Sequence, residues 1–238
     1  MTHDLRMNHD LRVTDDLRMT DDLRPRRSVL YMPAANARAL EKAKAIPADA
    51  LIVDLEDAVA PDAKETAREQ AVAAASSGEY GSREVTIRCN GLDTPWGAAD
   101  IEAAAAAGPA GIVVPKVTGT AHLGAIAAAM EAAGAPDHTA IWPMVETPEA
   151  IFAVREIAAF ERVGVMVMGT NDLAKELRAA LIPGRQPLVP HLATAVLAAR
   201  AEGVAILDGV FNDIADAEGF EAECRQGFEM GFDGKTLI

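Results

Sequence analysis

Short runs of hydrophobic residues recur along the chain from residue 28 onward, and polar residues follow most of them. Apolar runs of four to seven residues, separated by helical patterns, are typical of parallel strands that are buried on both faces. We predict eight such strands, at residues 28–32, 50–55, 85–89, 112–115, 141–145, 163–168, 205–211 and 234–238. Eight strand–helix units predict an α/β fold, a (β/α)8 or TIM barrel. A doubly wound sheet is the alternative, but no glycine-rich phosphate loop follows the first strand.

The pattern is clearest between residues 141 and 173, where two apolar runs flank a predicted helix at residues 148–161. A helical crossover makes the two strands parallel, so that Glu146 and Asp172 follow strand ends at the same edge of the sheet. Two carboxylates without a neighbouring His or Cys suit a hard cation such as Mg²⁺ better than zinc. The alternative is that both side chains cap helices, since Thr147-Pro148 is a good helix start.

Other charged side chains also follow predicted strands, and in a barrel they converge on the face where the chemistry is expected. Arg88 suits the two oxygens of a carboxylate, or it forms an ion pair with Asp54 or Glu56. Lys116 either holds a carboxylate or pairs with Glu146. The remaining residues of this set are Asp54, Glu56, Asp57 and Asn90.

The three acidic residues after the second strand, Asp54, Glu56 and Asp57, have two interpretations. They either contact the water molecules of a bound metal ion or cap the helix that follows, and we favour the first. His3, His9, His122, His138 and His191 are scattered, which argues against a histidine-based mechanism. No G-x-S-x-G motif is present, and neither cysteine has an evident histidine partner.

Composition restricts the partners of the protein. The net charge of −14 argues against nucleic acid and against an anionic membrane surface. Cys89 and Cys224 form no disulfide framework, which favours a cytoplasmic location. The sequence contains no signal peptide and no apolar run near 18 residues, so no membrane association is expected.

The two ends of the sequence differ from the barrel pattern. Residues 1–24 consist of four similar hexamers ending in Asp-Leu-Arg, whose leucines form no helical stripe. We interpret residues 1–25 as a disordered low-complexity tail and residues 26–238 as the catalytic domain. The sequence stops in or just after the eighth predicted strand, so we expect a barrel that lacks its last helix and C-terminal cap. The polypeptide is then either a fragment or a protein without its usual C-terminal cover.

Several motifs, in this order, resemble the HpcH/HpaI aldolase–citrate lyase family, and specifically its branch that cleaves CoA esters. They are RRSVLYMPAANARALEKA (26–43), LIVDLEDAVAPDAKETAR (51–68), TIRCNGLDTPWGAADI (86–101), VVPKV (113–117), MVETPEAI (144–151), MGTNDLAKEL (168–177) and GFDGKTLI (231–238). The resemblance covers nearly the whole chain from residue 26. The GTND form of the metal motif, beside YMPAAN, is most similar to malyl-CoA-type members.

The resemblance implies a Mg²⁺-dependent enzyme that cleaves or makes a 3-hydroxyacyl-CoA such as malyl-CoA, as a lyase giving an oxo-acid and acetyl-CoA or as a thioesterase. It implies that Glu146 and Asp172 bind the metal and that Arg88 binds the carboxylate of the oxo-acid. It also implies a homo-oligomer, a trimer or a hexamer. Asn36 and Lys42 match positions on the CoA side, and Asn171 lies within the metal motif. In relatives an acidic residue comes from the segment that would follow residue 238, so the catalytic acid/base stays unassigned.

Three other functions stay open at this stage. One is a citrate lyase β subunit that acts on a carrier-bound citryl thioester. Another is a truncated, inactive barrel that serves as an oligomer partner. The third is an aldolase that acts on free 2-oxo acids, because such relatives share the barrel and its paired carboxylates.

Overall fold

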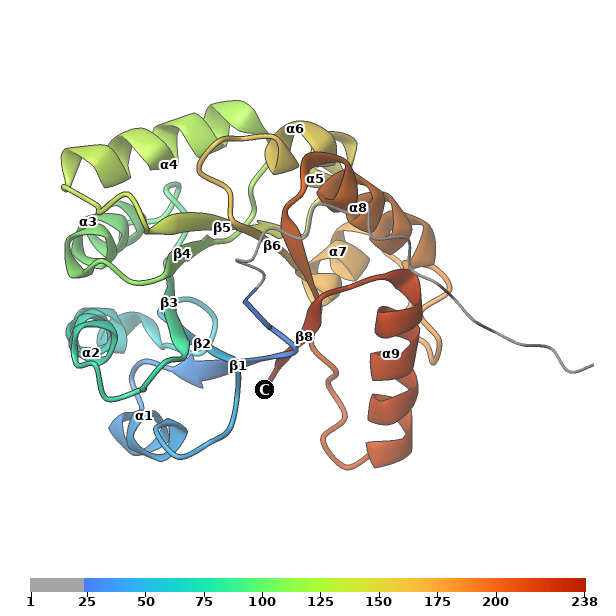
Figure 1. Cartoon of the computed structure of the whole chain (residues 1–238), viewed down its shortest axis with the longest axis horizontal. Helices are drawn as coiled ribbons and strands as arrows, with labels where there is room; N and C mark the ends of the chain where they lie inside the picture. Colours follow the sequence, from blue (N-terminus) through green and yellow to red (C-terminus); the bar gives the residue numbers. More distant parts are fainter. Residues whose placement is uncertain (1–23) are drawn as a thin grey trace, which may run out of the picture.

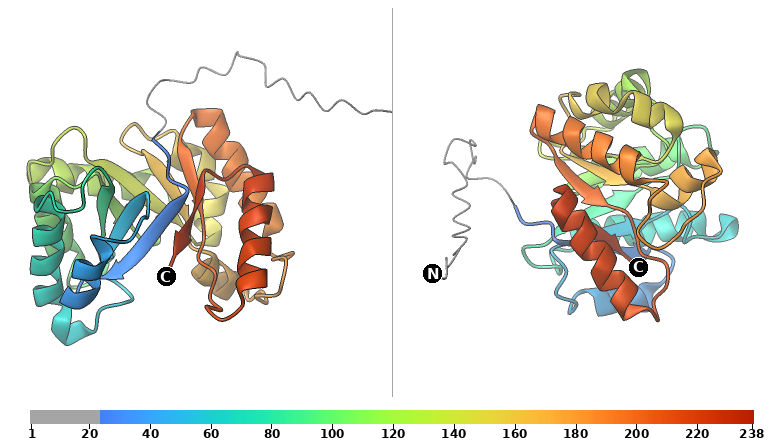
Figure 2. Two further views of the ribbon diagram at one scale, coloured as in Figure 1. Left: turned by 60° about the horizontal axis from the view of Figure 1, so that its bottom comes forward. Right: turned by 90° about the vertical axis from the view of Figure 1, so that its right-hand side faces the viewer.

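Eight parallel strands pair in the order of the sequence and close into a barrel, because the eighth strand pairs with the first (Figure 1). The structure, a computed structural model, describes residues 24–238. The predicted (β/α)8 fold is therefore confirmed. The predicted tail, except its last two residues, lies outside the described residues. The chain ends one residue after the last strand, beside the first strand in both views of Figure 2.

The strands of the barrel are β1 Ser28–Pro33, β2 Ala50–Asp54, β3 Glu84–Arg88, β4 Gly111–Val114, β5 Ala140–Val145, β6 Val165–Met168, β7 Ala205–Asp208 and β8 Gly234–Leu237. The helices are α1 Ala37–Ala43, η1 Pro61–Ala63, α2 Lys64–Ser76, α3 Gly97–Ala107, α4 Thr120–Ala132, α5 Pro148–Phe152, α6 Val154–Ala158, α7 Thr170–Leu177, α8 Val189–Glu202 and α9 Ala217–Met230. In Figure 1 these helices surround the strands. None of the helices in this part of the chain is long and apolar enough to cross a membrane.

Three predicted elements differ from the structure by two residues or more. The predicted helix at 148–161 is divided into α5 and α6, because the backbone of Ala153 leaves the helical region at φ −100° and ψ 12°. Strand β6 begins two residues later than predicted, and Val163 forms only an isolated bridge with Ile141. Strand β7 ends at Asp208, whose carboxylate accepts a hydrogen bond from the main chain of Gly209 and helps to turn the chain.

Alternate residues of the strands fill the interior of the barrel. One buried cluster contains Val29, Ala50, Ile52, Val113, Trp142, Met144, Val165, Val167 and Leu207, which are spaced two apart wherever they share a strand. This period of two is that of a strand. Trp142 has room because a Cβ atom on Gly111 would lie 2.5 Å from its indole nitrogen. The guanidinium of Arg26 stacks over the same ring at 5.5 Å.

A second, larger cluster lies between the strands and the helices, and most helices contribute several buried residues to it. Helix α8, for example, buries five residues. Helix α9 buries only Gly227, although it has the same length of 14 residues. Ion pairs hold α9 against the barrel instead: its Glu223 accepts a 2.7 Å contact from Lys235 of β8.

Candidate active site at the carboxyl ends of the strands

The alternation that fills the barrel continues into polar residues at its carboxyl end. Asp54 follows Ile52 on β2, and Glu146 follows Met144 just after β5, so both side chains point into the barrel. Arg88 of β3 lies beside Asp54 in the strand register. These side chains border a cavity of about 450 Å³. Its lining residues are Tyr31, Pro33, Asp54, Asp57, Ala58, Arg88, Met144, Glu146, Met168, Gly169, Thr170, Asn171, Asp172, Val210, Asn212, Thr236 and Ile238.

Glu146 is almost completely buried, with 2% of its surface exposed. Its Oε1 atom accepts a hydrogen bond of 2.7 Å from the main-chain N–H of Lys116. Lys116 lies in the left-handed region at φ 50°, which is unusual for a residue with a side chain. Burial raises the pKa of Glu146 to about 7; the hydrogen bond from Lys116 opposes this shift, and the negative charge of Asp172 adds to it.

Asp172 lies in the first turn of α7 and lines the same cavity as Glu146. Gly169 permits the close approach of this turn, because a Cβ atom there would lie 2.2 Å from Oε2 of Glu146. The part of the chain that the structure describes holds no group of three or more His, Cys, Asp or Glu side chains placed to bind a metal. Two carboxylates that share one cavity nevertheless fit Mg²⁺, which keeps several water or substrate ligands. The donor set therefore suits this ion.

Arg88 forms the ion pair that was one of its two predicted roles. Its Nε and Nη2 atoms contact the two oxygens of Asp54 at 2.6 and 2.7 Å. Its Nη1 atom lies 2.9 Å from Glu56 and 3.4 Å from Asp57. The three acids and the ring of Tyr31, 4.9 Å from the guanidinium, surround this cation. The pKa of Arg88 is raised because the hydrogen bond and charge of Asp54 outweigh the opposing effect of burial, which is the largest single influence.

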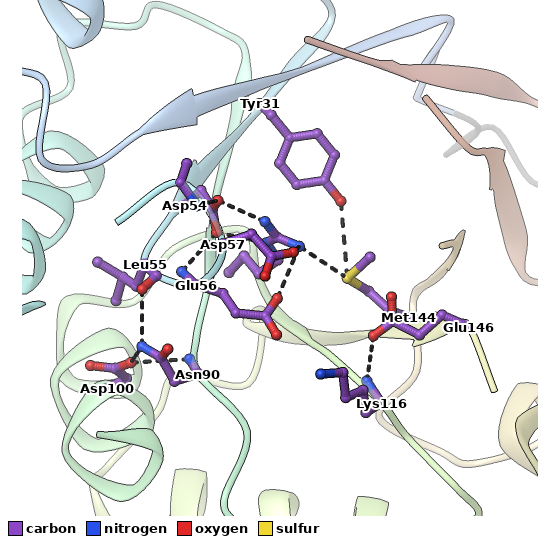
Figure 3. Close-up of polar contacts among 12 residues, drawn as sticks. Tyr31, Asp54, Leu55, Glu56, Asp57, Asn90, Asp100, Lys116, Met144 and Glu146 are labelled. Atoms are coloured by element: carbon purple, nitrogen blue, oxygen red, sulfur yellow. Dashed lines mark hydrogen bonds and ion pairs between the residues drawn. The ribbon is translucent and has the colours of Figure 1, made fainter. Parts of the chain in front are cut away.

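Asp54 also fixes the loop that carries the other two acids. Its Oδ1 atom accepts a 2.9 Å hydrogen bond from the N–H of Glu56, and its Oδ2 atom accepts one of 3.1 Å from Ala58. Burial raises the pKa of Glu56 to about 8; the positive charge of Arg88 opposes the shift, and nearby carboxylates such as Asp57 add to it. Figure 3 shows these acids on one side of the site and Glu146 on the other.

The remaining predicted residues lie in different places. Asn171 lines the cavity and exchanges side-chain hydrogen bonds of 3.0 and 2.8 Å with Asn212. Asn36 caps α1, and Lys42 is exposed in the last turn of that helix; neither lines the cavity, so their role toward CoA stays a prediction. The side chain of Lys116 forms no ion pair within residues 24–238, so the predicted pairing of its ammonium group with Glu146 is wrong. The main-chain N–H of Lys116 contacts Glu146 instead.

The sequence analysis misplaced Asn90 and missed Tyr31. Asn90 does not face the barrel mouth: it lies two residues beyond the end of β3, where the strand alternation no longer sets its direction, and its side chain bonds to Asp100 of α3 and to Lys64 of α2. Tyr31 is absent from the predicted set, although it lines the cavity and its hydroxyl lies 4.0 Å from the sulfur of Met144 (Figure 3). Its alternation with Val29 on β1 is the signal in the sequence that points to it.

Comparisons with known proteins agree with this architecture. Residues 27–238 match the family model described as HpcH/HpaI aldolase/citrate lyase. The chain is 50% identical over 214 residues to a (3S)-malyl-CoA thioesterase of Cereibacter sphaeroides, covering 90% of this chain and 73% of the relative. It is 36% identical to the citrate lyase subunit beta of Escherichia coli, covering 90% of this chain and 72% of that one.

A solved structure supports the same relationship. The CitE protein of Mycobacterium tuberculosis, in complex with magnesium and acetate, has a TM-score of 0.77 and 30% identity, covering 91% of this chain and 87% of that chain. The match to the family model spans nearly all of the described residues, and the matches to the sequence relatives span most of their length. This chain belongs to the HpcH/HpaI aldolase/citrate lyase family.

Proposed function

We propose that this protein is a Mg²⁺-dependent enzyme that acts on malyl-CoA or a similar 3-hydroxyacyl-CoA, and that it hydrolyses the thioester. The observation that carries the proposal is the pair Glu146 and Asp172 in one cavity with Arg88. The 50% identity to a (3S)-malyl-CoA thioesterase supports the substrate class and the reaction. The relative named L-malyl-CoA/beta-methylmalyl-CoA lyase is more distant, at 32% identity.

Glu146 and Asp172 are the residues that would hold the metal ion. Oε1 of Glu146 is occupied by the N–H of Lys116, and Oε2 lies on the side of Gly169. Fixing one oxygen of a carboxylate by a hydrogen bond orients the other oxygen toward a ligand. A bound Mg²⁺ supplies positive charge that polarises an oxygen atom of the substrate. A solved structure of CitE from M. tuberculosis contains magnesium and pyruvate, and one of a citrate lyase beta subunit from the same organism contains magnesium and oxaloacetate.

Arg88 would bind the free carboxylate of the substrate. Its planar guanidinium presents two N–H groups in parallel, which match the two oxygens of a carboxylate. Asp54 holds the guanidinium from one edge with two short contacts, so that the orientation of Arg88 is fixed before the substrate binds. Such preorganisation places the substrate in one orientation, which is the main contribution of a binding residue to the rate.

In hydrolysis, water adds to the thioester carbonyl carbon, the C–S bond breaks, and malate and the CoA thiol are released. In the lyase reaction the bond between C2 and C3 of the malyl group breaks instead, giving glyoxylate and acetyl-CoA. Both reactions need the same carboxylate clamp. The two reactions differ in whether water reaches the thioester carbon. The CoA portion is expected to extend from the cavity toward solvent, and a CitE structure contains coenzyme A with magnesium and acetoacetate.

The test is to incubate the purified protein with (3S)-malyl-CoA and Mg²⁺ and to measure free thiol and glyoxylate separately. Thiol release without glyoxylate supports the thioesterase, and glyoxylate with acetyl-CoA identifies the lyase. Both products should disappear with excess EDTA. If neither product forms with Mg²⁺, the proposal is refuted.

A second candidate is the β subunit of a citrate lyase. The 36% identity to the E. coli protein favours this function over an inactive barrel and over an aldolase of free 2-oxo acids. Such a subunit would act on a thioester bound to a carrier protein. Turnover of a citryl group on an acyl carrier protein, together with inactivity on free CoA esters, would identify it.

A further inference from the structure

The guanidinium of Arg88 has one edge that is occupied by a fixed partner. Asp54 accepts from Nε and Nη2, at 2.6 and 2.7 Å, and the pair is buried, with 9% and 2% of the two side chains exposed. Breaking a buried, bidentate ion pair is costly. A carboxylate from outside must therefore bind Arg88 through the remaining Nη1–Nη2 edge, in which Nη1 points away from Asp54.

Nη1 of Arg88 also has internal partners. Glu56 lies 2.9 Å away and Asp57 lies 3.4 Å away, while the sulfur of Met144 is 3.9 Å away. The two carboxylates come from consecutive residues of the β2–α2 loop. A carboxylate of this protein thus contacts the same atom of Arg88 that a carboxylate substrate needs.

These two acids differ from Asp54 in how firmly they are held. The main chain of the loop is fixed, because Asp54 accepts hydrogen bonds from the N–H groups of Glu56 and Ala58. The side chain of Asp57, in contrast, is 69% exposed, and its only hydrogen bond within residues 24–238 is the 3.4 Å contact with Arg88. Rotation of the Asp57 side chain into water therefore needs no movement of the backbone.

We propose that Asp57, assisted by Glu56, competes with carboxylate ligands for Nη1 of Arg88, so that a ligand needs a further contact in the cavity to bind well. The inference rests on the proposed role of Arg88 in substrate binding. An anion that contacts only Arg88 displaces the carboxylate of Asp57 from Nη1 and puts its own carboxylate there, so it gains little binding free energy. A 2-oxo or 2-hydroxy acid would gain more, because its second oxygen also reaches the side of the cavity where Glu146 and Asp172 would hold Mg²⁺.

The decisive variant is Asp57→Asn, which removes the competing charge at an exposed position. Binding of acetate and of glyoxylate is measured by calorimetry with saturating Mg²⁺. An exposed ion pair contributes up to about 1 kcal/mol, so acetate should bind about two- to fivefold more tightly to the variant. Glyoxylate should gain no more than acetate, so the preference of the protein for glyoxylate over acetate should not rise. A rise in that preference would overturn the inference.

The matched control is Asp93→Asn. Asp93 is an exposed acid in the β3–α3 loop at the same end of the barrel, and it makes no contact with Arg88 in the structure. Its variant should bind acetate as the wild type does, whereas an equal gain in both variants would show a general charge effect and overturn the inference. Mg²⁺ affinity should stay within twofold in Asp57→Asn, and a larger change would overturn the inference, because the gain in acetate binding would then arise at the metal.

The outcomes separate this inference from the proposed function. If wild type and Asp57→Asn bind acetate equally, the competition by Asp57 is refuted, and the role of Arg88 is unaffected. If neither protein binds glyoxylate with Mg²⁺, the substrate-binding role of Arg88 fails and this inference fails with it.

Discussion

Gly169→Ala tests whether the approach of the β6–α7 turn to Glu146 creates the metal site. The added Cβ atom would lie 2.2 Å from Oε2 and 2.5 Å from Cβ of Glu146. Non-bonded carbon atoms prefer about 3.5–4.0 Å, so the two groups must separate by about 1 Å or more. Because the contact includes Cβ of Glu146, rotation of that side chain cannot relieve it completely. The strand β5 or the turn must move.

Two effects should follow from this displacement. Misplacing a metal ligand or its support costs about 10- to 100-fold in metal affinity, and we expect a loss of this size for Mg²⁺. Overpacking costs about 1–3 kcal/mol of the free energy of unfolding. Gly169 has φ −97°, outside the left-handed region, so backbone strain does not contribute to either effect.

The measurements are calorimetric titration with Mg²⁺ and urea unfolding without metal. The control is Gly124→Ala in α4, where the added Cβ atom would have no neighbour within 4 Å among residues 24–238, apart from its own helix backbone and adjacent residues. This control should be stabilised by up to about 1 kcal/mol, because alanine favours a helix over glycine, and its Mg²⁺ affinity should not change. Wild-type Mg²⁺ affinity in Gly169→Ala would refute the assignment of Glu146 as a ligand at this turn.

Three further predictions concern the charged residues of the site. The pKa of Glu146 is raised from 4.5 to about 7, so the metal-free folded protein binds more protons than the unfolded chain between these values. The contribution of this residue to the free energy of unfolding should therefore fall as pH rises from about 4.5 to 7, and urea unfolding of Glu146→Gln should lack this slope. The Mg²⁺ affinity of the wild type should rise toward pH 7, which Mg²⁺ titrations at several pH values check. Asp54→Asn leaves Arg88 buried without its main partner and should lower the free energy of unfolding by about 3–5 kcal/mol, whereas a loss below about 1 kcal/mol in urea titrations would show that Glu56 and Asp57 suffice. Arg88→Lys should raise KM for the acyl substrate, since an ammonium group cannot replace the planar fork, and an unchanged KM would leave Arg88 a structural role only.

Strand periodicity makes the barrel and the ends of its strands predictable. An inward residue is followed two positions later by another inward residue, and this places Asp54 after Ile52 and Glu146 after Met144. The same rule would place Asn90 at the mouth, two positions after Arg88, but β3 ends at Arg88 and the side chain of Asn90 instead contacts Asp100 and Lys64 on the helices. The hydrophobicity of residues 209–211 favours a longer β7, but Asp208 turns the chain before them.

The sequence indicates which residues lie in the site more readily than it indicates which of them contact each other. The charges near Arg88 are evident from the sequence, but the choice of Asp54 as the bidentate partner depends on the neighbouring register of β2 and β3. The left-handed backbone of Lys116, which presents its N–H to Glu146, has no sequence signal, because glycine or asparagine is the usual residue there. Tyr31 does not stand out in the sequence, because an aromatic residue within a strand is most often part of a core.

Helix α9 buries only one of its residues against the barrel, and its ion pairs with Lys235 and Arg185 carry much of its attachment. Segments with few buried apolar contacts open locally at a lower free energy than the rest of a domain. The amide protons of α9 should therefore exchange with deuterium before those of α8, and protease should cleave there first. The ion pairs themselves are nearly buried, with 4–14% of each side chain exposed, so added salt should change this opening little. The wall of the barrel beside β8 is therefore the part of the molecule that denaturant or heat should open first.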